Sequence, residues 1–586
     1  MPYPLHLSEK KRVLRGPYHL IAALVLVGTL PVATSAAAPV AERGMAEAAA
    51  EEKAPAKPQQ APPNETHMVA MRDGTPLATD VYLPTDGEGP WPVILVRTPY
   101  GKNQDGAWLA SAVCGQGYAL ASQDMRGRFE SPGSDALIFH NDGWSERRDG
   151  HDTLEWIAKQ PWSNGRVCTW GGSALGITQN MMAPSAPEVL KAQHVEIALS
   201  DFYAQGAYQG GALRKALAEG WLEEIEADPA NLETFRRHYR YDQLWEEMNP
   251  EAKAHRVNTP AVFWGGWYDI FCQGTINSFV TIHNRGGPGA RGRCRLVVGP
   301  WAHGPFTSEE ITYPNSEGPD ALVTALRFFD HWAKGADNGV PDDPPVQYYV
   351  MGDTTDPGAP GNCWRTADNW PPPAKLTRFY FHSDGKLIPR VRPTGEGKRS
   401  YRYDPRDPVP TIGGQNLMIS MGPMDQRPVE GPEDVLLFTS EELVEPLEVT
   451  GHIYATLFIS SDRPDTDFTV KLTDVYPDGH SMLVTDGIMR ARFRDSFERE
   501  TFLEPGQVYE MTVDLWSTSL VFNKGHRIRV AVSSSNSPRF DPNPNTGKPP
   551  RADDETHVAT NDVHLSKRHP SHIALPIYAG PARAQH

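Results

Sequence analysis

The chain has 586 residues and a formal net charge of −17, with 39% hydrophobic and 22% charged residues. This length exceeds what one hydrophobic core can serve, so several folded domains are expected. An acidic chain without a basic patch is unsuited to a phosphate backbone, so nucleic acid is disfavoured as a partner and none is expected. The five cysteines are scattered and form no C-x-x-C pair, so no disulfide framework is predicted.

The N-terminus reads as a secretory signal peptide over residues 1–38. A basic start at Lys10–Arg15 precedes an apolar run at Leu20–Leu30 and a small-residue zone at Thr34–Ala38. The apolar run is shorter than the ~20 residues that span a bilayer. We therefore expect cleavage and a secreted or periplasmic protein with no integral membrane segment; an uncleaved N-terminal anchor is the alternative. Residues 39–63 lack apolar periodicity and are predicted to be a disordered linker.

The next segments, 64–200 and 260–355, alternate short apolar strands with amphipathic helical stretches. This alternation predicts an α/β domain with a mostly parallel sheet, opened by a hairpin that turns at Asp73-Gly74. The predicted strands are Val93–Arg97, Tyr118–Asp124, Val167–Gly171, Gln193–Leu199, Pro260–Trp264 and Arg295–Val298, and the predicted helices are Glu146–Gln160 and Ala321–Gly335.

Two further segments differ in pattern. Residues 201–259 are helical in composition and interrupt the sheet strands, where a helical cap is expected. Residues 356–586 are predicted to form a second, all-β domain, because Ile453, Ala455, Leu457 and Ile459 recur at period two between turn residues. Such a pattern is typical of an antiparallel sandwich, here a jelly roll. The sequence does not fix the oligomeric state.

Ser173 lies in Trp170-Gly-Gly-Ser-Ala-Leu-Gly176, where a predicted strand turns into a helix. Small neighbours allow the sharp turn that exposes a nucleophilic serine, and the helix start directs N–H groups at a nearby anion. The pattern departs from G-x-S-x-G because Leu175 stands in place of the second glycine. The alternative is a glycine-rich turn with an incidental serine.

A serine nucleophile needs a base and a carboxylate that orients the base. In α/β-hydrolases these residues follow the serine in the order acid, then histidine. Asp269 follows the strand in PAVFWGGWYD, and His303 follows the strand in RLVVGPWAH, so we predict the triad Ser173, Asp269 and His303. Taken singly, each residue could be an ordinary loop residue. Three other histidines are rivals by residue type only. His151 and His194 precede Asp269 and so fall outside this order, and His283 lies in the middle of a segment.

The tetrahedral intermediate requires hydrogen-bond donors in an oxyanion hole. The backbone N–H of Ala174 is one candidate and the hydroxyl of Tyr100, in VRTPYGK, is the other, although Tyr100 could be packing. Aromatic residues near the triad suggest a pocket for an apolar acyl group, with Phe271, Trp267 and Trp301 as tentative substrate contacts. Tyr268, Tyr203 and Tyr208 belong to the same set, and any member could be core. No metal constellation is visible, and this chemistry requires neither metal nor cofactor.

Several motifs together resemble one family of serine hydrolases. TPYGK, QDMRGRFESPG, EWIAKQPWSNGRV, GGSALG, GGWYD, GPWAH and KGHRIRVAVSSSNSPRFDPNPNTG occur in order between about Thr66 and the C-terminus. They are similar to the cocaine esterase and X-prolyl dipeptidyl-peptidase-like family, often called CocE/NonD. The resemblance implies an α/β-hydrolase core, an inserted helical cap and a C-terminal jelly-roll domain. It also implies the roles given above for Ser173, Asp269, His303, Tyr100 and Ala174.

One position departs from the family. Members often carry tyrosine directly after the nucleophile, whereas this chain has Ala174. Because that position contributes its backbone, catalysis should survive with an altered acyl pocket. The resemblance leaves several substrate classes open: small esters or amides, X-prolyl dipeptides, and α-amino-acid esters or acylase substrates. The acids Glu219, Glu223, Glu224 and Glu226 are predicted to be a solvated helix face. A catalytically dead binding protein is the alternative from another class.

Overall fold

The computed structural model describes residues 62–304, 308, 310–550, 552 and 554–580. The predicted signal peptide and nearly all of the predicted linker lie outside these residues. Within them, no helix combines the length and hydropathy needed to cross a membrane. The five cysteines, all in the described part of the chain, are free thiols.

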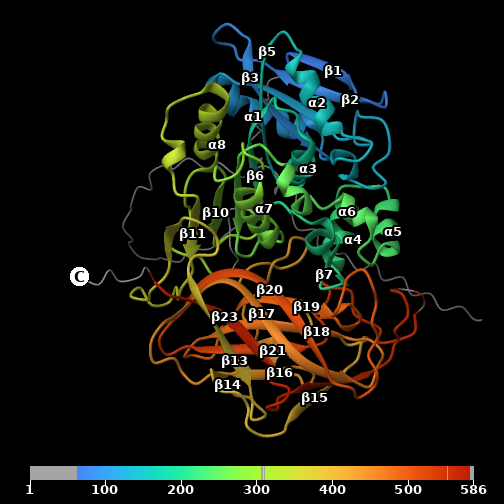
Figure 1. The fold of residues 1–586 in the computed structure, drawn as a ribbon, viewed down its shortest axis with the longest axis vertical. Helices are drawn as coiled ribbons and strands as arrows, with labels where there is room; N and C mark the ends of the chain where they lie inside the picture. Colours follow the sequence, from blue (N-terminus) through green and yellow to red (C-terminus); the bar gives the residue numbers. More distant parts are fainter. Residues whose placement is uncertain (1–61, 305–307, 309, 551, 553, 581–586) are drawn as a thin grey trace, which may run out of the picture. The chain divides into compact units, whose positions relative to one another are not determined.

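The first domain is built on a ten-stranded sheet in the order β1-β2-β4-β3-β5-β6-β9-β10-β11-β12. Figure 1 labels β1, β2, β3, β5, β6, β10 and β11 of this sheet. The strands from β4 through β11 along this order pair in parallel, and the edge pairs β1–β2, β2–β4 and β11–β12 are antiparallel. The strands are β1 Glu65–Ala70, β2 Pro76–Tyr82, β3 Trp91–Thr98, β4 Ala119–Asp124, β5 Ser163–Gly172, β6 Leu190–Glu196, β9 Ala261–Gly266, β10 Arg295–Gly299, β11 Val346–Val350 and β12 Cys363–Ala367.

Helices cover both faces of this sheet, and β3 shows why its sequence is continuously apolar. Val93 and Leu95 pack in the cluster that contains Leu154 of α2, whereas Ile94 and Val96 pack in the cluster that contains residues of α1 and α8. A parallel strand covered on both faces needs apolar residues at every position. The helices of this domain are α1 Lys102–Val113, α2 Asp149–Ala158, α3 Ala174–Met182, α7 Cys272–Arg285 and α8 Ala321–Phe329.

Most sequence-predicted elements are confirmed, with three differences. The strand predicted to reach Leu199 ends as β6 at Glu196, because Ile197 has a positive φ of 41° that interrupts the extended backbone. The helix predicted over 321–335 is α-helical to Phe329 and continues as a π-helical turn over Asp330–Lys334. The residues of β12, assigned by sequence to the second domain, pair with β11 and complete the first sheet.

Between β6 and β9 the chain forms the predicted helical segment. A π-helical turn at Phe202–Ala207 leads into a short hairpin of β7 Tyr208–Gln209 and β8 Ala212–Leu213. The helices that follow are α4 Lys215–Glu224, α5 Ala230–Arg237, α6 Gln243–Glu247 and a 3-10 turn at Glu251–Arg256.

The C-terminal region consists of antiparallel sheets, as predicted from its period-two pattern. Ile453, Ala455, Leu457 and Ile459 alternate inward on β17 and are fully buried. One sheet follows the order β14-β13-β23-β17-β22-β15 with β20 on β17, and a second follows β16-β21-β18-β19. The strands are β13 Ala374–Phe381, β14 Leu387–Pro389, β15 Lys398–Tyr403, β16 Leu436–Thr439, β17 Leu447–Ser461, β18 Asp467–Val475, β19 Ser481–Arg490, β20 Tyr509–Phe522, β21 Arg527–Ser533, β22 Ala559–His564 and β23 His572–Tyr578, and one short helix is α9 Arg427–Glu430.

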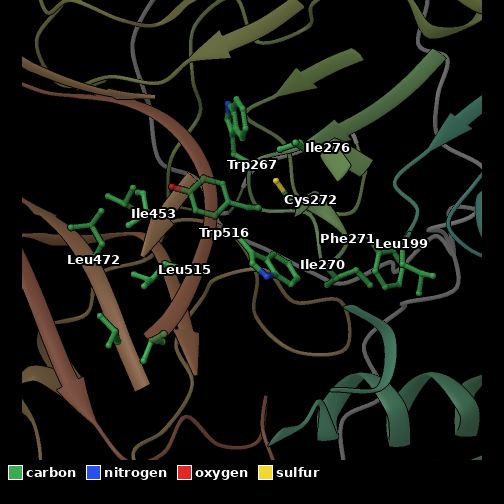
Figure 2. Close-up of a cluster of buried hydrophobic side chains, with 14 of the residues drawn as sticks. Leu199, Trp267, Ile270, Phe271, Cys272, Ile276, Ile453, Leu472, Leu515 and Trp516 are labelled. Atoms are coloured by element: carbon green, nitrogen blue, oxygen red, sulfur yellow. The ribbon is translucent and has the colours of Figure 1, made fainter. Parts of the chain in front are cut away.

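The loop after β9 and the start of α7 share a hydrophobic core with this β domain. Figure 2 shows Trp267, Ile270, Phe271, Cys272 and Ile276 gathered with Ile453, Leu472, Leu515 and Trp516 of the β strands. Polar contacts join the same surfaces: the Tyr268 hydroxyl donates to the Leu483 carbonyl at 3.0 Å, and the Ser517 N–H donates to Gln273 Oε1 at 2.9 Å. The β domain therefore buries the underside of the loop that carries Asp269.

A second connection is a buried histidine held by two carboxylates. His526 lies 2.9 Å from Asp474 of β18 through Nδ1 and 3.3 Å from Asp353, just after β11, through Nε2. The Tyr476 ring packs beside it at 4.3 Å. Burial by itself would lower the pKa of His526, but the hydrogen bond and charge of Asp474, with the charge of Asp353, raise it.

We expect this arrangement to make stability depend on pH. A histidine pKa that is higher in the folded state stabilises the fold below the unfolded value of about 6.5, and this stabilisation is lost as pH rises through the folded value. His526→Gln should lower the free energy of unfolding by about 3 kcal/mol at pH 6, because two buried carboxylates lose their cation. The difference from wild type should shrink toward pH 9 in urea titrations.

The matched control is His480→Gln. His480 also contacts a carboxylate, Asp478 at 2.7 Å, but both side chains are largely exposed, and exposed pairs contribute little. A His526→Gln penalty that is equal at pH 6 and pH 9 would contradict a charged histidine at this site.

Candidate active site

Ser173 occupies a strained turn between β5 and α3. Its φ of 54° and ψ of −124° lie outside the regions that L-residues favour. Its neighbours must be small: a Cβ on Gly176 would lie 2.8 Å from both the Ala198 Cβ and the Glu196 carbonyl, and a Cβ on Gly171 would lie 2.4 Å from the Leu175 Cβ. The Ser173 N–H donates to the Glu196 carbonyl at 3.0 Å. This turn projects the serine hydroxyl away from the sheet.

A hydrogen-bonded chain joins Ser173 to a histidine and a buried aspartate. His303 Nε2 lies 2.9 Å from Ser173 Oγ, and His303 Nδ1 lies 2.5 Å from Asp269 Oδ2. Asp269 is fully buried, and its Oδ1 accepts from the Phe271 N–H at 2.8 Å. An ionised carboxylate only accepts, so Nδ1 carries the proton and leaves Nε2 to accept from the serine.

Sheet topology explains how residues 130 positions apart meet. Strands β5, β9 and β10 are parallel, so their carboxyl ends reach the same edge, where the loops bearing Ser173, Asp269 and His303 begin. The two later loops are also bonded together, since the Trp267 N–H donates to the Gly299 carbonyl and the Tyr268 N–H to the Trp301 carbonyl, each at 2.9 Å. A Cβ on Gly266 would lie 2.1 Å from that Trp301 carbonyl, so this approach requires glycine.

The two donors predicted for an oxyanion beside Ser173 are the Ala174 N–H and the Tyr100 hydroxyl. Ala174 is the first residue of α3, and an N–H at that position has no partner within the helix. Tyr100 lies in the loop between β3 and α1, and its Oη accepts a hydrogen bond from Trp221 Nε1 at 3.1 Å. An indole N–H can only donate, so the phenol oxygen is the acceptor in this contact.

Trp221 was not identified from the sequence. It lies on α4 in the helical segment, is half-buried, and stacks on Phe139 with ring centroids 5.9 Å apart. In the sequence it occupies an ordinary apolar position of an amphipathic helix, and nothing there indicates a contact with a residue 121 positions earlier. The contact depends on how the helical segment folds back over the loop after β3.

The structure separates the three tentative substrate contacts. Phe271 lies edge-on to His303, with ring centroids 5.8 Å apart. Trp267 instead donates to the Tyr349 carbonyl at 2.7 Å and packs on Trp370. Trp301 donates to the Ser316 carbonyl at 2.9 Å and stacks on Trp264. Both tryptophans are core residues, because their indole nitrogens and ring faces are already occupied by the protein.

The other aromatic candidates are also structural. Tyr268 is buried against the β domain, and Tyr203 and Tyr208 stack on each other at 4.9 Å within the helical segment. Of the acids on that segment, Glu219 pairs with Lys215 and Arg236, whereas Glu223, Glu224 and Glu226 are exposed as predicted.

The rival histidines take part in other contacts. His151 Nδ1 lies 2.7 Å from the Ser185 carbonyl, and His194 lies 3.0 Å from Glu196. His283 packs on Phe279 inside α7, where burial lowers its pKa. Among the described residues, the histidine that contacts Ser173 is His303.

Two family models and a curated relative match most of the chain. Residues 73–225 and 214–305 match the X-Pro dipeptidyl-peptidase (S15 family) model, and 338–574 match the X-Pro dipeptidyl-peptidase C-terminal non-catalytic domain. The chain is 36% identical over 583 residues to the cocaine esterase of Rhodococcus sp. (strain MB1 Bresler), covering 87% of this chain and 97% of that protein.

Two solved structures are similar over nearly the whole chain. An aminopeptidase from the marine sediment archaeon Thaumarchaeota archaeon aligns with a TM-score of 0.76 and 25% identity, covering 90% of this chain and 100% of the other. An α-amino acid ester hydrolase aligns with a TM-score of 0.75 and 26% identity, covering 91% of this chain and 100% of the other. Both alignments extend across the α/β and the all-β regions.

The backbone at Ser173 generates a stability prediction. Because glycine adopts positive φ without a Cβ penalty, Ser173→Gly should be more stable than Ser173→Ala by about 1 kcal/mol. Both variants lose the hydrogen bond to His303, so their difference isolates the backbone conformation. At a relaxed position the order is reversed, since glycine costs more conformational entropy. The stability of the two variants is compared by thermal unfolding. A strained turn would be contradicted if Ser173→Ala were more stable than Ser173→Gly.

Proposed function

Because the chain belongs to the CocE/NonD family of serine hydrolases, we propose that it cleaves ester or amide bonds of small acyl substrates through an acyl-enzyme on Ser173. The observation that carries this proposal is the continuous hydrogen-bonded chain from Ser173 Oγ through His303 to buried Asp269. The same chain argues against the alternative of a binding protein with a dead hydrolase core.

The proposed reaction has two halves. His303 Nε2 takes the Ser173 proton as Oγ attacks the carbonyl carbon, and Asp269 stabilises the imidazolium that forms. Collapse of the tetrahedral intermediate breaks the bond to the leaving alcohol or amine, which receives the proton from His303. A water molecule then attacks the acyl-enzyme with His303 again as base, releasing the acid and restoring Ser173.

The Tyr100 hydroxyl and the Ala174 N–H are proposed as the oxyanion hole. Tyr100 is supported by the hydrogen bond that its oxygen accepts from Trp221, because accepting a hydrogen bond polarises the phenol O–H as a donor. Ala174 is supported by its place at the start of α3, where the helix dipole favours negative charge. Donors of this kind each contribute about 10²–10³-fold in kcat.

We further propose that residues 201–259 act as a cap and that the C-terminal domain is a jelly roll. The Trp221–Tyr100 contact supports the cap, because it brings α4 to the loop after β3. The two antiparallel sheets support the jelly roll. The order of basic, apolar and small residues over 1–38 supports export to the periplasm or the medium.

For the acyl group we propose an apolar or aromatic side chain. Phe271, Trp221 and Phe139 supply aromatic surface near His303 and Tyr100. A free α-amino group would need a carboxylate aimed at it. Glu196, whose carbonyl binds Ser173, carries one, but its Oε1 accepts from Trp170 Nε1 at 2.9 Å and lies 3.0 Å from His194. This carboxylate is already used by the protein.

A second candidate is hydrolysis of substrates with a free amino terminus, as by an X-prolyl dipeptidyl-peptidase or an α-amino-acid ester hydrolase or acylase. The similarity to the aminopeptidase and the α-amino acid ester hydrolase structures favours it.

The nucleophile is tested by Ser173→Ala. Removing a triad nucleophile costs on the order of a millionfold in turnover, so the folded variant should lose aryl-ester hydrolysis and labelling by a fluorophosphonate. Tyr100→Phe is the control, since it keeps the nucleophile: it should still be labelled while kcat falls about 10²–10³-fold. Retention of more than about one per cent of turnover in Ser173→Ala would remove Ser173 from the mechanism.

The substrate class is tested with matched ester pairs. Phenylacetate and phenylglycine methyl esters differ by one amino group, and we expect the phenylacetate ester to be hydrolysed at least as well by kcat/KM at neutral pH. A preference above about tenfold for the amino ester, equal to ~1.4 kcal/mol of transition-state binding, would favour the second candidate.

A further inference from the structure

Arg214 is a buried cation behind the loop that carries Asp269. It follows β8 at the start of α4 and is 2% exposed. Within the part of the chain that the structure describes, no carboxylate lies within ion-pair distance of it. Other buried arginines, such as Arg490 and Arg492, are paired with aspartates. An uncompensated guanidinium in a protein interior is costly and calls for a physical explanation.

The guanidinium contacts three separate elements. Its Nη1 donates to the Gln205 carbonyl in the π-helical turn and to the Ile270 carbonyl at 3.1 Å. Its planar face lies over the Trp516 ring of β20, 5.5 Å from the centroid. Arg214 therefore joins the helical segment, the loop after β9 and the β domain at one point.

The same contacts place its charge beside the triad. Ile270 is the next residue after Asp269, whose carboxylate binds His303. Burial and the charge of Arg539 lower the pKa of Arg214, and the charges of Asp269 and Asp486 oppose that effect, so that the pKa is about 9. Asp486 forms an ion pair with Arg539, and Asp269, which contacts His303, exerts the larger of the two opposing charge effects on Arg214.

The surrounding backbone is fixed, which makes the contact precise. Trp516 has a φ of 65°, and its N–H donates to Asp514 Oδ1 at 2.8 Å. The next residue, Ser517, donates to Gln273 in the first turn of α7. The Trp516 ring is thus held in place, and it packs against the guanidinium that donates to the Ile270 carbonyl.

We propose that Arg214 is a positioning residue: it fixes the Asp269 loop through the Ile270 carbonyl, and its charge opposes protonation of the Asp269–His303 pair. The inference rests on the proposed function, because it assigns Asp269 and His303 to the triad. It gives the helical segment and the β domain a direct influence on the reaction.

The test compares Arg214→Gln with Arg214→Lys on an aryl ester across pH. Glutamine keeps hydrogen-bond donors but removes the charge. We expect the acidic limb of the kcat/KM profile to move upward by about one pH unit, because loss of a nearby cation favours the protonated pair. Plateau kcat should fall about 10–100-fold, with KM little changed, because the acid loop is displaced.

Lysine keeps the charge but lacks the planar fork. Its acidic limb should remain in place, while kcat falls about tenfold. Arg492→Met is the control for loss of a buried guanidinium far from the loop, and it should lower stability without moving the limb. Aryl-ester kinetics are corrected for the folded fraction by circular dichroism in every variant.

The outcomes separate the two assignments. An unchanged limb and kcat in folded Arg214→Gln would overturn the proposal, as would a limb shift of equal size in Arg214→Lys. If Arg214→Gln fails to fold, wild-type kcat in Arg214→Lys overturns the positioning role. Hydrolysis retained by Ser173→Ala would instead show that the triad assignment failed, whatever Arg214 does.

Discussion

The positive φ of Ser173 is the constraint on which the rest of the site depends. A non-glycine residue in that conformation costs about 1–3 kcal/mol and persists only where its surroundings over-determine it. Here the hydrogen bond to Glu196 and the close approaches at Gly171 and Gly176 fix the turn between a central strand and a buried helix. The packing around the turn stabilises it by more than the strained backbone of Ser173 costs. The serine hydroxyl is therefore held in one position, pointing away from the sheet.

The two residues that continue the hydrogen-bonded chain from Ser173 are positioned in a different way. Asp269 and His303 lie on loops joined by main-chain hydrogen bonds, and the Asp269 loop rests on the β domain through Tyr268 and the cluster around Trp516. Residues more than 200 positions apart thus form one core. Because a buried loop with satisfied polar groups cannot shift without losing several contacts together, the β domain supports the loop that carries Asp269.

The sequence was sufficient to predict that Ser173, Asp269 and His303 come together, because each follows an apolar strand and the three strands end at one sheet edge. It failed where function depends on which way a side chain faces. Trp267 and Trp301 are near Asp269 and His303 in sequence, yet both rings turn into the core. Trp221 and Arg214 reach the site only through tertiary packing of the helical segment, and no local pattern records that. The residues of β12 were predicted to belong to the second domain, but they pair with β11 of the first sheet, and composition does not reveal which strand a segment pairs with.

Charge placement around the site follows from desolvation. A carboxylate or guanidinium removed from water is tolerated only with partners, and each buried acid near Ser173 has them: Asp269 has His303, and Glu196 has Trp170 and His194. Neither Asp269 nor Glu196 therefore has a carboxylate available to bind the ammonium group of a ligand. Arg214, the buried cation nearby, adds a field that disfavours a second positive charge. The charges on this side of Ser173 therefore support the proposed neutral acyl group, as does the aromatic surface of Phe271 and Trp221.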